Sequence, residues 1–143
     1  MGATLVDSNV ILDILTEDTE WQEWSAAALS RQADAGPLVI NPLVYAEVSA
    51  RFDRIEDLEA ALPREYFQRQ ALPWEAAFLA GRAFVRYRRR GGQRRSPLPD
   101  FYIGAHALVG RMTLLTRDGR RYRVYYPALR LRAWERWSVA ARD

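Results

Sequence analysis

The stretch "ATLVDSNVILDIL", residues 3–15, contains the two patterns that decide the fold. Residues 3–7 are mostly apolar and close on Asp7, which is typical of a short buried strand. Apolar residues then recur at helical spacing over residues 8–15, with Ser8 or Asn9 where a helix N-cap is expected. A buried strand that ends in a carboxylate and leads directly into a helix indicates an α/β architecture.

Short apolar runs alternate with helical patterns along the rest of the chain. Further strands are expected at residues 37–40, 66–73, 112–118 and 128–131. Helices are expected at residues 19–36, 41–52, 55–62, 73–90 and 100–111, with a loop at residues 91–99. Short apolar strands separated by helices favour parallel pairing. We therefore expect an α/β sandwich with helices on both faces of a short, mainly parallel sheet.

The composition is that of a soluble globular domain. The chain has 143 residues, of which 49% are hydrophobic and 27% charged, enough for one domain with its own core. We expect residues 1–143 to form a single domain, with residues 132–143 as an extra helix or tail. The chain has no Cys and one His, which excludes disulfides, thiolate metal sites and a multi-histidine zinc site within one chain. Because neither a membrane span nor a signal peptide is visible, we expect a cytoplasmic protein without membrane contact.

Charge is distributed unevenly between the two halves of the chain. Residues 1–80 contain 5 Arg and 14 acidic residues, whereas residues 81–143 contain 16 Arg and 4 acidic residues. Every basic residue is Arg, which binds phosphate through two parallel hydrogen bonds and stacks on bases. The arginine-rich half suggests a polyanionic partner, either nucleic acid or an acidic protein segment. A GC-rich genome would explain the missing Lys but not the asymmetry.

Four acidic residues follow expected strands or open the helices after them. They are Asp7, Glu47, Asp100 and Asp118. In a parallel sheet such positions meet at the carboxyl edge, where ligands bind. Four carboxylates in one cleft would repel each other, and a hard divalent cation would remove that repulsion. Mg²⁺ or Mn²⁺ prefers such oxygen ligands.

Each acid also has a structural interpretation. Asp7 could cap the following helix, and Glu47 could pair with Arg51 on an exposed helix face. Asp100 could be a helix-start acid that interacts with the helix dipole. Asp118 could belong to a turn with Gly119. Each acid alone is weak evidence for a functional site, whereas the four acids together favour a common site.

Four segments also resemble, in order, the signature segments of PIN-domain ribonucleases, most closely the VapC toxins of VapBC toxin–antitoxin pairs. They are "LVDSNVILDIL", "VYAEV", "SPLPDFYIGAHA" and "LLTRD". The resemblance runs from about residue 3 to residue 131 and implies a PIN-like α/β/α sandwich. It matches Asp7, Glu47, Asp100 and Asp118 to the family's catalytic, metal-binding acids. Asn9 and Thr116 match its supporting polar positions.

The resemblance also implies an activity and partners. The activity is Mg²⁺- or Mn²⁺-dependent endonucleolytic hydrolysis of RNA (tRNA, rRNA or mRNA), which stops translation. The expected partners are a second copy of the chain, in a homodimer, and a VapB-like antitoxin whose C-terminal part wraps the toxin. The tail "RAWERWSVAARD" departs from the family pattern, in which chains stop soon after the last strand.

The segment "RYRRRGGQRRSP", residues 86–97, joins the long expected helix to Asp100. We expect its arginines and one near Asp118 to clamp RNA phosphates, with Tyr87 available for stacking. They are Arg86, Arg88, Arg89, Arg90, Arg94, Arg95 and Arg117. The alternative is a solvated, flexible loop. Ser8 supports the site either by bonding a phosphate or by capping the helix, and we favour the cap.

His106 and the tryptophans have mainly structural interpretations. His106 is expected to point away from the face of Asp100 because of its helical spacing. The spacing W-x-x-W occurs twice, at Trp21 with Trp24 and at Trp134 with Trp137. Core packing is the favoured interpretation, and an exposed patch for a dimer mate or an antitoxin segment is the alternative.

Other functions fit less well. A haloacid-dehalogenase-like phosphatase requires an acid where Asn9 stands, and a P-loop enzyme requires a Gly-Lys pair that is absent. A DNA-directed nuclease of the flap-endonuclease type shares the acidic site, but we expect no extra DNA-gripping domain in a chain of this size. A catalytically silent PIN module that binds an antitoxin and regulates its own operon is also compatible with the sequence.

Overall fold

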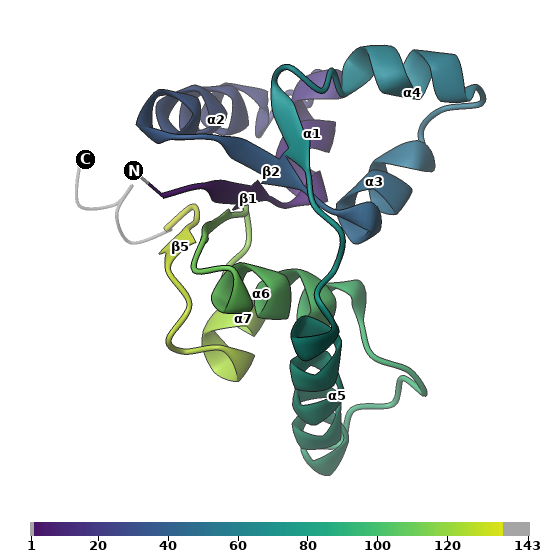
Figure 1. The fold of residues 1–143 in the computed structure, drawn as a ribbon, viewed down its shortest axis with the longest axis vertical. Coiled ribbons are helices and arrows are strands. Elements are labelled where there is room, and N and C mark those ends of the chain that lie inside the picture. Colours follow the sequence, from purple (N-terminus) through teal and green to yellow (C-terminus); the bar gives the residue numbers. More distant parts are fainter. Residues whose placement is uncertain (1, 136–143) are drawn as a thin grey trace.

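The computed structural model describes residues 2–135, which form one five-stranded parallel sheet with helices on both faces (Figure 1). The strand order is β3-β2-β1-β4-β5. The strands are β1 (Thr4–Val6), β2 (Leu38–Ile40), β3 (Phe67–Arg69), β4 (Thr113–Leu115) and β5 (Leu131–Arg132). All four strand pairings are parallel, as the sequence predicted.

Seven helices among the described residues connect and cover the strands. They are α1 (Ser8–Leu15), α2 (Gln22–Ala35), α3 (Pro42–Ser49), α4 (Ile55–Ala61), α5 (Trp74–Arg89), α6 (Pro99–Val109) and α7 (Arg120–Tyr125). Helices α1, α2 and α4 lie on one side of the sheet, and α6 and α7 lie on the other (Figure 1). Helix α5 packs on α6 and extends away from the sheet. None of the described helices is long and apolar enough to cross a lipid bilayer.

The direction of the strand order reverses at β1. The chain first moves outward from β1 to β2 and β3, and then crosses back to β4 and β5 on the other side. The two series of connections diverge beyond the carboxyl ends of β1 and β4, which leaves a crevice there. The residues directly after these two strands, Asp7 and Thr116, therefore lie at the position where α/β sheets bind ligands.

The core explains why the central strands read as continuous apolar runs. Leu5, Val39 and Leu114 are neighbours in three adjacent strands and are fully buried, because helices cover both faces of the sheet. On the α6 side, a Cβ at Gly104 would lie 2.6 Å from the Tyr126 ring, so α6 contacts the aromatic residues around α7 closely. Close packing on this side holds α7 over the carboxyl ends of β1 and β4.

The structure corrects the sequence prediction at one helix, three strands and one helix cap. The short helix α7 was not predicted, because its "RRYRVY" segment shows no clear helical periodicity. The strands expected at residues 66–73 and 112–118 are shortened to Phe67–Arg69 and Thr113–Leu115, and the strand expected at residues 128–131 is shifted to Leu131–Arg132. Asp7, and not Ser8 or Asn9, is the N-cap of α1: its side chain accepts a hydrogen bond from the backbone N–H of Ser8.

Candidate functional site

Asp7 lies at the centre of the crevice and is almost completely buried, with 4% of its surface exposed. Its Oδ1 accepts the hydrogen bond of the Ser8 N–H at 2.8 Å. Its Oδ2 accepts two hydrogen bonds, from Thr116 Oγ1 at 2.9 Å and from the Tyr122 hydroxyl at 2.8 Å. All three donors are neutral, so the Asp7 carboxylate is held in place without a direct countercharge.

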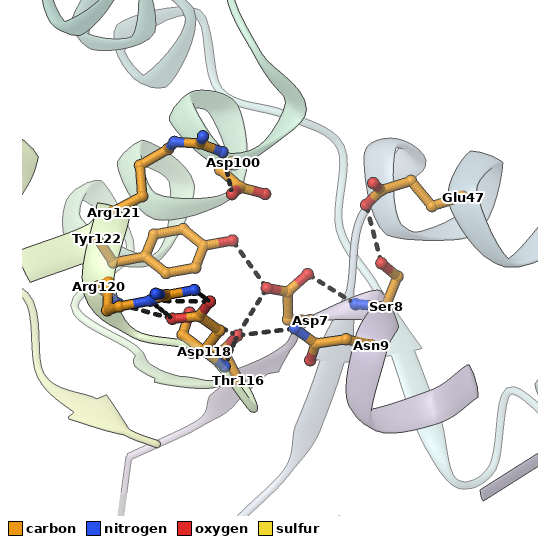
Figure 2. Close-up of polar contacts among 10 residues, drawn as sticks. All are labelled: Asp7, Ser8, Asn9, Glu47, Asp100, Thr116, Asp118, Arg120, Arg121 and Tyr122. Carbon is orange, nitrogen blue, oxygen red and sulfur yellow. Dashed lines mark hydrogen bonds and ion pairs between the residues drawn. The ribbon is translucent and has the colours of Figure 1, made fainter. Parts of the chain in front are cut away.

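Glu47 faces the same crevice from the second turn of α3 (Figure 2). Its Oε1 accepts a hydrogen bond from Ser8 Oγ at 3.0 Å. Among residues 2–135 no ion pair joins Glu47 to Arg51, so the surface-pair interpretation is wrong. The Ser8 hydroxyl orients Glu47. The prediction that the Ser8 side chain caps helix α1 is therefore also wrong, because Asp7 is the N-cap.

Asp100 lies in the first turn of α6, on the opposite side of the crevice. Its Oδ2 pairs with Arg121 Nη1 of α7 at 3.1 Å. The ion pair is half-exposed, so Asp100 is reachable from solvent. Asp100 thus has the location of a helix-start acid and also points into the crevice beside Tyr122 (Figure 2).

Asp118 follows β4 and is the most exposed of the four acids. Its Oδ1 accepts a hydrogen bond from the Arg120 backbone N–H at 3.1 Å, and its Oδ2 pairs with Arg120 Nη2 at 2.6 Å. This local pattern agrees with the turn interpretation. Asp118 lines the same crevice as Asp7, but its carboxylate is directed at a guanidinium.

Thr116 and Asn9 tie the two halves of the crevice together. The Thr116 hydroxyl is fully buried, donates to Asp7 Oδ2 and accepts a hydrogen bond from Asn9 Nδ2 at 3.2 Å. Asn9 Oδ1 in turn accepts a hydrogen bond from the Arg117 backbone N–H at 3.1 Å. These contacts connect the start of α1 to the loop after β4 and keep the Asp7 carboxylate in one orientation.

The crevice is an open, polar cleft of about 680 Å³. All four predicted acids line it. Its lining residues are Asp7, Ser8, Asn9, Glu47, Arg90, Asp100, Arg117, Asp118, Arg120, Arg121, Val124 and Tyr125. The cleft therefore combines an acidic floor with an arginine-rich rim.

The electrostatics of the acids differ across the cleft. The pKa of Asp7 is raised to about 6, mainly by burial and also by the charges of Asp100 and Glu47, against the lowering effect of the Tyr122 and Thr116 hydrogen bonds. Burial and the charge of Asp100 also raise the pKa of Glu47, although the Ser8 hydrogen bond opposes the shift. The Arg120 hydrogen bond lowers the pKa of Asp118.

The donor set fits a hard divalent cation in its chemistry. Asp7, Glu47 and Asp100 offer carboxylate oxygens, and their mutual repulsion is the kind that a cation relieves. Their arrangement is open: within residues 2–135 no three Asp, Glu or His side chains are grouped closely enough to hold a metal ion by themselves. Water ligands beside one or two carboxylates, as Mg²⁺ prefers, agree with this spacing.

The predicted arginines divide into two groups. Arg90 and Arg117 line the cleft, whereas Arg86, Arg88, Arg89, Arg94 and Arg95 do not belong to its lining. Arg117 is already engaged, because its Nε and Nη2 bond the Asp13 carboxylate at 3.0 Å each and its guanidinium lies over Trp21.

The arginines outside the cleft lining have local contacts or face solvent. Arg86 Nη2 donates to the Tyr125 carbonyl at 2.9 Å, and Arg88 Nη1 donates to the Arg94 carbonyl at 2.9 Å. Arg89 and Arg95 are exposed. This group can reach only substrate that extends beyond the cleft.

Arg120, Arg121 and Tyr122, which all lie on α7, were not singled out individually from the sequence. Their adjacency was visible in the sequence, but neither the helix nor the partners of its side chains were. The Tyr122 hydroxyl contacts a carboxylate 115 residues away, and Arg121 contacts one 21 residues away. Recognising α7 as a helix would have been the first signal.

His106 and the tryptophans lie outside the cleft lining. His106 is buried and bonds Asn41 Nδ2 at 3.0 Å and Gln70 Oε1 at 3.2 Å, in line with the structural interpretation, and burial lowers its pKa. Trp24 packs against the core, and Trp21 meets Trp134 edge to face with ring centroids 5.1 Å apart. Trp137 and the rest of the tail beyond residue 135 lie outside the described residues.

The family model of the PIN domain matches residues 4–126. The chain therefore belongs to the PIN-domain family, as the signature segments indicated. The match covers α1, α3 and α6 and the loop after β4, which carry the candidate acids. A comparison with curated proteins finds no match.

Solved structures similar to this chain include VapBC toxin–antitoxin complexes. VapBC2 from Rickettsia felis, bound to a promoter DNA fragment, is similar with a TM-score of 0.70 and 17% identity, covering 93% of this chain and 99% of that one. VapBC-1 from nontypeable Haemophilus influenzae is similar with a TM-score of 0.69 and 16% identity, covering 92% and 98%. FitAcB from Neisseria gonorrhoeae has a TM-score of 0.64 and 18% identity, covering 94% and 98%. At these identities the likeness establishes the shared fold.

Proposed function

We propose that this PIN-domain protein is a Mg²⁺- or Mn²⁺-dependent endoribonuclease that acts as the toxin of a toxin–antitoxin pair. The observation that carries the proposal is the group of carboxylates Asp7, Glu47 and Asp100, which lie where the direction of the strand order reverses. Burial and mutual repulsion raise the pKa values of Asp7 and Glu47 there, so the group favours a bound cation. The arginine rim supports a phosphate-rich substrate.

The chain's own residues have separate roles in this proposal. Asp7, Glu47 and Asp100 would hold the cation together with water molecules, with Asp118 at the edge of the site. Bound there, the cation would polarise a phosphoryl oxygen and lower the pKa of a water molecule. Thr116, Asn9 and Ser8 orient the acids, and the rim arginines neutralise the RNA backbone. We also propose a cytoplasmic location, because RNA is the substrate of this function.

The test is cleavage of total cellular RNA and of single-stranded DNA by the purified protein with Mg²⁺, Mn²⁺ or EDTA. Asp7→Asn and Asp100→Asn are compared with Asp53→Asn, which removes an equal charge at an exposed position outside the cleft. We expect discrete, metal-dependent RNA fragments from the wild type and Asp53→Asn but not from the two cleft variants. Cleavage of DNA alone would identify a flap-type nuclease. Equal cleavage by all variants, or none by the wild type, would contradict the enzyme and favour a silent regulatory module.

An apolar groove supports a protein partner of the antitoxin kind. It has a volume of about 450 Å³ and lies between α1, α2 and α4, lined by residues that include Ile14, Leu15 and Tyr66. Its lining suits the apolar face of an amphipathic segment. The solved structures of similar fold are toxin–antitoxin complexes, which agrees with such a partner. We expect Leu15→Arg to weaken the complex with the product of an adjoining antitoxin gene, measured by calorimetry, while the cleavage rate of the free protein stays unchanged.

A stripe on α5 supports a homodimer. Trp74 is 91% exposed and Phe78, one turn later, is 67% exposed. A Cβ at Gly81 would meet nothing within 4 Å, so a ring from another chain can approach the backbone there. If a second copy packs antiparallel about Phe78, Glu75 of each helix faces Arg82 of the other, which makes the surface self-complementary.

Light scattering tests this surface. We expect a dimer for the wild type and for Ile55→Ser, which removes an exposed apolar side chain on α4, and a monomer for Phe78→Arg. A dimer that survives Phe78→Arg would exclude the α5 stripe as its interface.

A further inference from the structure

Three consecutive residues at the start of α7 each contact a different candidate acid (Figure 2). The pairs are Arg120 with Asp118, Arg121 with Asp100, and Tyr122 with Asp7. Two of the contacts are ion pairs and the third is a neutral donor on a carboxylate. One short helix therefore contacts both the acids that pair with arginines, Asp118 and Asp100, and the buried acid Asp7, which accepts hydrogen bonds from neutral donors.

The two ion pairs are exchangeable. The Arg120 side chain is 87% exposed and the Arg121 side chain 46% exposed, and ion pairs this exposed contribute little to stability. Both guanidiniums stand on flexible stems at the rim of the cleft. Each can therefore leave its carboxylate for a better anion without disturbing the fold.

Helix α7 itself is fixed. Tyr122 is 2% exposed and bonds Asp7, and the Tyr126 hydroxyl just after the helix donates to the Phe101 carbonyl at 2.8 Å. Gly104 leaves no room for a side chain between α6 and these rings. The helix backbone thus keeps its place while the arginine side chains can reorient.

We propose that Arg120 and Arg121 are phosphate-binding residues that rest on Asp118 and Asp100, and that a divalent cation at the acids releases them to the RNA backbone. The inference rests on the proposed function and adds a coupling between its two ligands. Cation and RNA then bind cooperatively. A cation on the carboxylates frees the arginines for RNA phosphates, and RNA that binds the arginines frees the carboxylates for the cation. Thermodynamic linkage makes this coupling reciprocal.

The charges support this exchange. A guanidinium and a divalent cation that share one carboxylate repel each other at a few ångströms, so Arg121 competes with a cation for Asp100. A phosphodiester offers the guanidinium two oxygens in matching geometry, which makes it a suitable second partner. Asp7 and Glu47 are held by neutral donors, so they need no such exchange.

The first measurement is Mn²⁺ binding without nucleic acid, followed by electron paramagnetic resonance, in the wild type, Arg121→Gln and Arg121→Lys. Arg31→Gln, an exposed arginine on α2, is the matched control. We expect Arg121→Gln to bind Mn²⁺ about two- to fivefold more tightly than the wild type, because a competing charge worth up to about 1 kcal/mol is removed. Arg121→Lys and Arg31→Gln should stay close to the wild type.

The second measurement is the affinity for a short, fluorescein-labelled 2′-O-methyl oligoribonucleotide, in Mn²⁺ and in EDTA, with the probe checked for integrity afterwards. We expect Mn²⁺ to tighten binding of the probe to the wild type, and the gain to shrink in Arg121→Gln and further in the Arg120→Gln/Arg121→Gln double variant. A role of Arg121 in stability alone would shift thermal unfolding and leave this gain intact.

The outcomes separate the inference from the function on which it rests. Mn²⁺ and probe that both bind the wild type but bind independently would overturn the coupling and leave the proposed function standing. Weaker Mn²⁺ binding by Arg121→Gln would also overturn it, because Arg121 would then position Asp100 for the cation. A wild type that binds no Mn²⁺ would overturn the proposed function, and the coupling with it.

Discussion

The two walls of the cleft hold the same type of side chain in opposite ways. On the β1 and α3 wall, Asp7 and Glu47 are buried or half-buried and accept hydrogen bonds from hydroxyls and a backbone N–H. On the wall formed by α6 and α7, Asp118 is exposed and Asp100 is partly buried, and both carboxylates pair with guanidiniums.

This difference decides the electrostatic character of each wall. Burial without a direct countercharge raises the pKa of Asp7 to about 6, whereas Arg120 lowers the pKa of the more exposed Asp118. The first wall carries unfavourable charge that a cation can relieve, whereas each acid of the second wall already has an arginine partner. The environment, and not the residue type, therefore assigns each acid its role.

The largest expected effect is a difference in catalysis between the most buried and the most exposed of the four acids, Asp7 and Asp118. We expect Asp7→Asn to lower the rate of RNA cleavage at least about 100-fold, because the central anionic ligand for the cation is lost. Asp118→Asn should lower it only about tenfold, since Asp118 lies at the edge of the site and already has a partner. Single-turnover cleavage of one RNA substrate measures both rates. Equal losses would mean that Asp7 and Asp118 contribute alike.

The second effect is the pH dependence of stability. The pKa of Asp7 is raised from 3.8 to about 6 on folding, so its protonation favours the folded state; this contribution is fully present below about pH 4 and is lost as pH rises through about 6. Between pH 4 and 7 the wild type should lose about 2 kcal/mol relative to Asp7→Asn, in urea unfolding with EDTA. If the free energies of unfolding of the two proteins change in parallel with pH, the pKa of Asp7 is not raised on folding.

The third effect concerns Tyr122, whose hydroxyl differs from that of other buried tyrosines because it donates a hydrogen bond to Asp7. Tyr122→Phe removes a hydrogen bond to a buried carboxylate and should lower the free energy of unfolding by about 2 kcal/mol. It should also raise the pKa of Asp7, because that hydrogen bond lowers it. Tyr126→Phe is the control: it removes a bond to the Phe101 carbonyl and should leave the Asp7 titration unchanged, as followed by carboxyl-carbon NMR.

The smallest effect concerns Arg120, which is highly exposed. Arg120→Gln should raise the pKa of Asp118 toward its ordinary value, because the guanidinium that lowers it is gone. Carboxyl-carbon NMR titration measures this shift, and thermal unfolding should hardly change. In the wild type, high salt should produce part of the same shift by screening the pair. A large loss of stability would mean that the second wall is structural rather than exchangeable.

Much of the architecture was accessible from the sequence. The run to Asp7 followed by "SNVILDIL" predicted a buried strand leading into a helix, and short apolar strands between helices predicted the parallel sheet. Because carboxyl ends of parallel strands share one edge, the same pattern placed Asp7 and Asp118 at a common cleft. Two features of the site had weaker signals in the sequence. Helix α7 lacks helical periodicity, and the cap of α1 was assigned to Ser8 although Asp7 is the N-cap.

The sequence by itself determined which residues stand at the ends of strands, since burial periodicity and helix starts are local properties of the chain. Only the tertiary structure decided the partner of each acid. Tyr122 reaches Asp7 across 115 residues, and Arg121 rather than an arginine of the 86–97 loop reaches Asp100. The physical reason is that a hydrogen bond requires contact within about 3 Å, and such contacts depend on how α6 and α7 pack on the sheet. That packing gave one wall of the cleft neutral donors and the other its guanidiniums.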